Sequence, residues 1–112
     1  MRTIIIVFSA FLLALPGIRS QETMVYSHDQ KTYQKALELY RNQQYQAAQT
    51  LFEHVRDHTA DQETRANSSY YIANAAVRLN QLGADRLMED FVEQYPTSTK
   101  RNAAYMDVAD YY

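Results

Sequence analysis

Apolar side chains recur along most of this chain at intervals of three and four residues, the spacing that lines one face of an α-helix. In the stretch YRNQQYQAAQTLFEHV, the residues Tyr45, Ala48 and Phe52 fall on one such face. The pattern predicts an all-α fold. Its five helical segments cover about 29–42, the stretch around 45–55, about 62–79, about 84–92 and about 97–112.

Helix start and stop signals mark the boundaries between these segments. Ser27 and Gln30 form a capping-box pair at the first segment, and Asp61 is placed to cap the third. Pro96 ends the fourth segment, because a proline disfavours the helical conformation in the residue before it. After residue 20, Gly83 and Pro96 are the only glycine and proline, which is the composition of a helical protein.

The first, third and fifth segments carry apolar stripes of one common spacing. A large residue opens each stripe, at Tyr33, Ile72 and Tyr105, and further stripe positions follow three, four and seven residues later. The second and fourth segments overlay when Tyr45 is matched to Ala84, an offset of 39 residues. Helix pairs repeated every 33 to 39 residues are typical of a helical solenoid. On this overlay the most buried residues should be Tyr33, Ala36, Leu37, Tyr40, Tyr45, Ala48, Phe52, Ile72, Ala75, Ala76, Leu87 and Phe91.

This spacing resembles the tetratricopeptide repeat, in the divergent form found in exported bacterial proteins. The matching positions are Tyr33, Ala36, Leu37 and Tyr40 in the first helix of the repeat, and Tyr45, Ala48 and Phe52 in the second. FVEQYPTS also looks like the link between repeats in periplasmic members of that family. The chain departs from the family in a turn after Tyr40 that is one residue shorter, and in Ala84 and Leu87 of the fourth segment. The resemblance implies antiparallel helix pairs in a short α-solenoid of about two and a half repeats. The first repeat covers 29–58 and the second 61–95, and 97–112 is the first helix of an incomplete third repeat.

The resemblance also implies a function. Repeats of this family bind an extended peptide or a partner protein on the surface lined by their first helices. A non-enzymatic interaction scaffold of the bacterial periplasm and cell envelope is therefore expected. The alternative is the N-terminal helical module of a peptidoglycan-processing enzyme, which a catalytic motif further along the gene would favour.

The residues expected to face the partner follow from the same resemblance. The carried-over positions are Lys31, Gln34, Glu38, Arg41, Tyr70, Ala73, Val77, Asn80, Ala103, Met106 and Asp110. Of these, Gln34, Glu38, Arg41, Tyr70, Val77, Asn80 and Met106 are the candidate binding residues. They predict a groove with an apolar middle and a polar edge. In the alternative arrangement, residues 21–26 cover the apolar middle.

The start of the chain has the pattern of a secretory signal peptide. Arg2 precedes an apolar run at 4–15, which is short for a membrane span, and Pro16 and Gly17 break the helix before the small residue Ser20. Residues 1–20 are therefore interpreted as a signal peptide and 21–28 as an extension. Cleavage would leave an exported, periplasmic chain without a membrane span, and a partner could hold this chain at the outer membrane. The alternative is that the segment stays uncleaved and anchors the chain.

Composition excludes several kinds of partner and cofactor. The chain has no cysteine, so disulfides and thiolate metal sites are excluded. Without Arg2 and Arg19, the eleven basic residues become nine against thirteen acidic ones, a net charge near −4. That charge argues against binding to nucleic acid. A protein or an extended peptide remains as the expected partner.

Few residues have the pattern of a catalytic or metal site. His54 and His58 share one helix face, but a metal needs further ligands and no HExxH order is present. Glycine-rich phosphate loops and nucleophile elbows are absent from the sequence. We therefore expect no cofactor, no catalysis, and no change of melting temperature with a chelator.

The fifth segment ends on an apolar stripe that no sixth helix follows. The stripe contains Tyr105, Val108, Ala109 and Tyr112. In a solenoid each repeat covers the next, so an uncovered stripe is unfavourable. We expect this helix to fray, to self-associate, or to be completed by further sequence.

Overall fold

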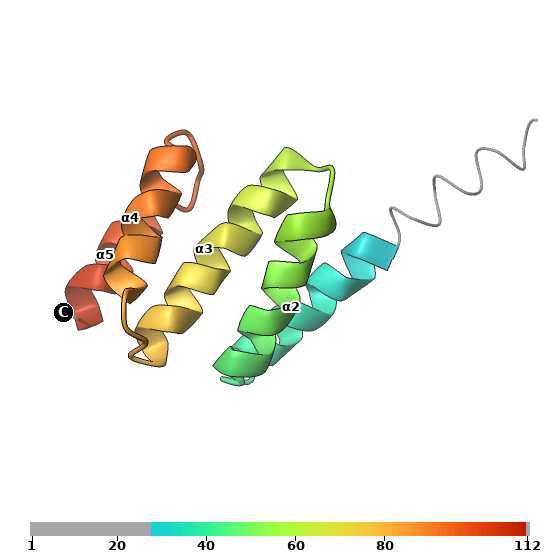
Figure 1. Ribbon diagram of the computed structural model, residues 1–112, viewed down its shortest axis with the longest axis horizontal. Coiled ribbons are helices and arrows are strands. Elements are labelled where there is room, and N and C mark those ends of the chain that lie inside the picture. Colours follow the sequence, from blue (N-terminus) through green and yellow to red (C-terminus); the bar gives the residue numbers. More distant parts are fainter. Residues whose placement is uncertain (1–27, 112) are drawn as a thin grey trace, which may run out of the picture. The chain divides into compact units, whose positions relative to one another are not determined.

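The computed structural model describes residues 28–111, and every regular element in that range is an α-helix (Figure 1). The first helix covers 28–41 of the described chain and is followed by α2 (Tyr45–His58), α3 (Gln62–Arg78), α4 (Ala84–Gln94) and α5 (Arg101–Tyr111). The predicted all-α class is confirmed over this range. None of these helices is both long and apolar enough to cross a membrane.

The chain divides into two units, Met1–Gln30 and Lys31–Tyr112, and the packing described below lies within the second. The expected signal peptide at 1–20 and the covering role of residues 21–26 fall outside the described residues.

The first helix and α3 end in the same hydrogen-bonded turn. Each terminates at a residue with a left-handed backbone, Gln43 with φ 62° and Asn80 with φ 54°. The amide after each of these residues, in Gln44 and Gln81, donates to a carbonyl five residues back, and the left-handed residue itself donates three residues back. This Schellman motif satisfies carbonyls that a helix end leaves without partners. Each turn reverses the chain so that the next helix runs back along the one before it.

Capping also sets where α3 begins. The Asp61 carboxylate accepts hydrogen bonds from the Thr64 amide at 3.0 Å and from the Thr64 hydroxyl at 2.6 Å. These bonds hold the pKa of Asp61 below its ordinary value, because they favour the charged form. The predicted cap at Asp61 is therefore confirmed.

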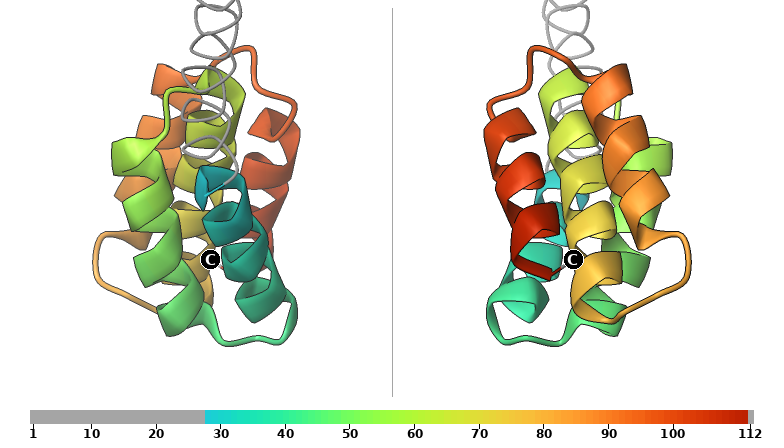
Figure 2. Two further views of the ribbon diagram at one scale, coloured as in Figure 1. Left: turned by 90° about the vertical axis from the view of Figure 1, so that its right-hand side faces the viewer. Right: turned by 90° about the vertical axis from the view of Figure 1, so that its left-hand side faces the viewer.

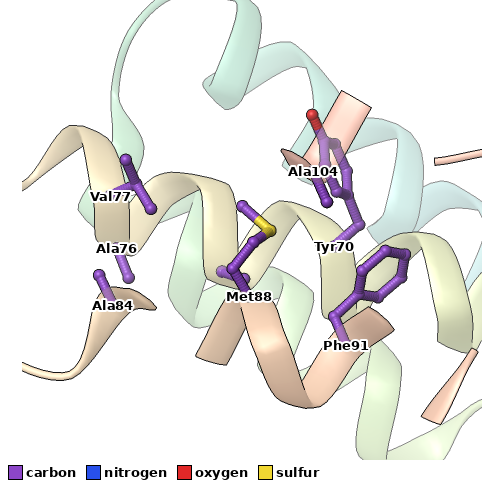
Figure 3. Packing of buried hydrophobic residues seen from close by; sticks show 8 residues of the cluster. Tyr70, Ala76, Val77, Ala84, Met88, Phe91 and Ala104 are labelled. Carbon is purple, nitrogen blue, oxygen red and sulfur yellow. The ribbon is translucent and has the colours of Figure 1, made fainter. Parts of the chain in front are cut away.

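Helix α3 lies at the centre of the unit and contacts helices on both sides. Figure 2 shows α2 and α4 on one side of it, with the first helix and α5 on the other. One buried cluster joins the first helix, α2 and α3, and contains Ala36, Ala48, Phe52 and Ile72. A second joins α3, α4 and α5, and contains Tyr70, Ala73, Ala76, Val77, Ala84, Met88, Phe91 and Ala104 (Figure 3). Helix α3 is therefore covered on two sides.

The buried faces of α2 and α4 repeat at an offset of 36 residues. In α2 the buried residues include Ala48, Phe52 and Val55, and the corresponding residues of α4 are Ala84, Met88 and Phe91, each at most 2% exposed. The predicted overlay at 39 residues, which buried Leu87, is wrong. Leu87 is 39% exposed and Met88 fills its place in the core. Both residues keep helical spacing with Ala84 and Phe91, so periodicity alone does not separate them.

Aromatic rings fill the space between the first helix, α2 and α3. Tyr71 lies at the centre of this group, stacked on Phe52 at a ring-centroid distance of 5.0 Å and edge-on to Tyr40 at 4.9 Å. Tyr33 meets Phe52 edge-on at 5.9 Å, and Tyr40 meets Tyr45 in the same way at 5.5 Å. Such offset and edge-to-face pairs add to the stability that burial of the rings gives. Tyr33, Leu37, Tyr40 and Tyr45 were expected in the core, and all four are partly buried.

Candidate functional site

The structure separates the seven candidate binding residues into two groups. Five are exposed: Gln34, Glu38, Arg41, Asn80 and Met106. The other two, Tyr70 and Val77, are 6% and 0% exposed and belong to the core. Figure 3 shows both among the buried side chains, where residues of α4 and α5 lie against them. The predicted apolar middle of the groove is therefore interior, and only the polar edge and Met106 are accessible.

A line of hydrogen bonds crosses the first helix, α3 and α5. The Tyr40 hydroxyl donates to Oδ1 of Asn74, and Nδ2 of Asn74 donates to Oδ2 of Asp107 at 2.6 Å. These three residues, which we call the ladder, are 34 and 33 positions apart in the sequence. They occupy one equivalent position in the first helix, α3 and α5, which alternate with α2 and α4 along the chain. The overlay that matched Tyr40 with Leu79 is accordingly wrong, and Leu79 is 37% exposed.

The central residue of the ladder is buried. Asn74 is 1% exposed, so water cannot easily replace its partners. Asp107 accepts a second hydrogen bond at the same oxygen, from the hydroxyl of Tyr70. Because this carboxylate belongs to α5 while both donors belong to α3, it fixes the position of one helix against the other.

Two cations lie along this network. Nε of Arg78 donates to Oδ1 of Asn74 at 3.0 Å, and its guanidinium carbon is 5.6 Å from the centre of the Tyr45 ring. Nζ of Lys100 is 5.3 Å from the centre of the Tyr71 ring and donates to the Tyr71 hydroxyl at 3.3 Å. Cation–π contacts of this kind add electrostatic attraction between the cation and the ring. Both cations therefore help to hold the aromatic side chains in place.

The tyrosine hydroxyls of the network remain donors across the ordinary pH range. Burial, with a further contribution from Asp107, raises the pKa of Tyr70 far above its ordinary value. Burial also raises the pKa of Tyr40. The protonated hydroxyls of Tyr40 and Tyr70 donate to Asn74 and Asp107, respectively.

His54 and His58 lie on the exposed face of α2, away from this network. Their rings stack at a centroid distance of 4.2 Å, and Nδ1 of His58 is 2.8 Å from the backbone oxygen of His54. Within residues 28–111, no three histidine, aspartate or glutamate side chains gather as metal ligands would.

The sequence reasoning missed Asn74 and Asp107. Both are polar residues inside helices whose apolar stripes had been aligned at offsets of 39 and 33. The offset of 33 residues already matches Asn74 with Asp107, and reducing the first offset from 39 to 34 places Tyr40 in the same register. Asparagine and aspartate at such a register are candidates for a buried hydrogen-bonded network.

Comparison with known proteins adds no relative to these observations. No family model matches the chain, and no curated protein or solved structure matches it. Its function is inferred from the arrangement of its own residues.

Proposed function

We propose that this protein is a non-enzymatic interaction scaffold of the tetratricopeptide-like class. It binds an extended peptide, or an extended segment of a partner protein, on the side of the unit formed by the first helix, α3 and α5. In keeping with the signal-like pattern at residues 1–20, its place of action is the bacterial periplasm or cell envelope.

The ladder is the single observation that carries this proposal. Tetratricopeptide repeats are helix pairs with a period of 34 residues. Tyr40, Asn74 and Asp107 repeat at 34 and 33 residues and are joined by hydrogen bonds from helix to helix. The paired Schellman turns at Gln43 and Asn80 support the same class, because they end the first helix of each pair in the same way.

A set of helices that hydrogen bonds join to one another suits the binding of an extended chain. Arg41 is the neighbour of Tyr40, and Met106 is the neighbour of Asp107, so the ladder spaces these two exposed side chains. Gln34 and Glu38 add hydrogen-bonding groups on the first helix. A surface that is ordered before binding loses less conformational entropy when a peptide binds. Polar side chains of mixed charge, with one exposed methionine, suit a peptide that carries both polar and apolar residues.

Peptide display tests the proposal. Short random peptides are selected on the immobilised chain, and their dissociation constants are measured by fluorescence anisotropy with the variants Gln34→Ala, Arg41→Glu and Met106→Ala. We expect each variant to weaken binding of the selected peptides several-fold. The matched control is Gln46→Ala, an exposed residue of α2 on the other side of α3, which should bind as the parent does. The proposal fails if no peptide is enriched, or if the control weakens binding as much as the three variants.

A further inference from the structure

A groove of about 270 Å³ runs between α4 and α5. Its apolar lining contains Met88, Val92, Ala104, Tyr105 and Ala109, and its acidic lining residues are Asp85 and Glu89. Tyr105 is 56% exposed although it belongs to this apolar surface. The groove shares no lining residue with the ladder or with the candidate peptide-binding residues.

The repeat within the chain shows what kind of element this surface fits. A shift of 33 residues places Tyr105 and Ala109 on Ile72 and Ala76 of α3. These two residues of α3 are 4% and 0% exposed, because helices α2 and α4 cover them. In Figure 3, Ala76 lies opposite Ala84, the small residue that begins α4. Tyr105 and Ala109 therefore occupy helix-packing positions, yet both are exposed in the structure.

The shape of a fitting helix follows from α2 and α4. Both bury a small residue, then a large one four positions later, then another large one three positions after that. Where this small residue faces an alanine of the neighbouring helix, the two helix backbones can approach each other closely. A helix with this pattern can place its small residue against Ala109 and its large residues against Tyr105 and Val92.

Charge distinguishes between possible occupants. The acidic side chains that line the groove are Asp85 and Glu89, which lie one turn apart on α4 and are exposed. The nearest cation on α5 is Arg101, at its first turn, with its guanidinium carbon 5.9 Å from the centre of the Tyr105 ring. An occupant with lysine or arginine along the α4 side gains attraction, whereas the same groove of a second copy brings like charges together.

We propose that the groove between α4 and α5 binds an amphipathic helix of a partner protein. That helix carries the small–large–large apolar pattern, with basic residues on the flank that faces Asp85 and Glu89. Helix-in-groove binding of this kind uses anchors at i, i+4 and i+7. The site is separate from the proposed peptide-binding side, so each can fail without the other.

The test uses two labelled helical peptides that differ only in charge. Both carry alanine, leucine and leucine in the stated pattern; one has lysines on the flank and the other has glutamates at the same positions. Fluorescence anisotropy measures their binding to the chain and to the double variant Asp85→Lys/Glu89→Lys. We expect the lysine peptide to bind the parent and to lose roughly tenfold in affinity on the variant, since two favourable pairs become repulsive. The glutamate peptide should show the opposite preference.

Controls separate the groove from general charge and folding effects. Asp90→Lys changes an exposed charge of α4 that does not line the groove and should alter binding by less than the double variant does. Tyr105→Glu places a charge in the apolar wall and should abolish binding, while circular dichroism verifies its helix content. The proposal is overturned if the lysine peptide fails to bind the parent, or if it binds the double variant and the parent equally. Sedimentation equilibrium adds one further outcome: a parent dimer that Tyr105→Glu dissociates, together with no peptide binding, would make a second copy the occupant.

Discussion

Replacing Asn74 with alanine tests the ladder most directly. The change removes the acceptor of Tyr40 and Arg78, and it removes a donor to Asp107. A hydrogen bond to a charged group contributes about 1.5–3 kcal/mol, and a neutral one about 0.5–1.5 kcal/mol. Because Asn74 is 1% exposed, water does not readily take its place. We expect the free energy of unfolding to fall by roughly 2–4 kcal/mol.

Urea denaturation followed by far-ultraviolet circular dichroism measures this loss. A domain of this size has a total stability of roughly 5–10 kcal/mol, so the variant should remain folded enough to analyse. A double-mutant cycle with Asp107→Ala then isolates the pair, and we expect a coupling free energy of roughly 1–3 kcal/mol. The exposed control Gln46→Ala should change stability by less than about 0.5 kcal/mol. Additivity of the two single changes within about 0.5 kcal/mol would refute the reasoning, because the two side chains would then not interact.

Three further changes test the packing, the cap and the buried hydroxyl. Ala48→Leu adds volume where the side chain is 0% exposed and should lower stability by about 1–3 kcal/mol, seen as a lower urea midpoint. Asp61→Ala removes the cap on Thr64 and should cost about 0.5–2 kcal/mol in thermal unfolding, whereas Asp61→Asn should cost much less. Burial raises the pKa of Tyr70, so the folded chain keeps a proton that the unfolded chain loses above about pH 10. This group should therefore leave stability unchanged below that pH and lower it as the pH rises above it. The fall in stability should be shallower in Tyr70→Phe. Denaturation midpoints of the parent and the variant over a series of alkaline buffers measure the two pH dependences.

The sequence predicted the helices and most of the first core cluster because the signals there are local. Asp61 and Pro96 mark boundaries through their own backbone and side-chain chemistry, and α3 begins and α4 ends beside them. Ala48 and Phe52 are the small and the large residue of one stripe, and both are fully buried. Such features depend on a few neighbouring residues, which is the range over which periodicity is informative.

The features that the sequence did not predict depend on which of two equivalent helix registers the packing selects. Leu87 and Met88 both fit the spacing of α4, and the position of α4 on α3 decides that Met88 is buried. Tyr70 and Val77 were placed on the binding surface through the resemblance, but Phe91, Ala84 and their neighbours cover them. Predicting the ladder requires the correct offset between the repeated helices, and a polar network leaves no periodic apolar pattern from which to find that offset. Tyr105 and Ala109 were expected on an uncovered stripe and both are exposed, but the α4 side of the groove, with Met88 and Val92, depends on where α4 lies.

The pairing of each helix with its near neighbours has a consequence for how the chain folds. Even the bond from Tyr70 to Asp107 closes a loop of only 37 residues, and the first cluster uses residues between 33 and 72. Low contact order of this kind favours fast folding, because little loop entropy is lost before contacts form. The first helix, α2 and α3 can therefore assemble while α4 and α5 are still emerging from a ribosome or a narrow channel. When α5 follows, its Asp107 meets Tyr70 and Asn74 already held on α3, so that assembly proceeds in one direction from the N-terminal side.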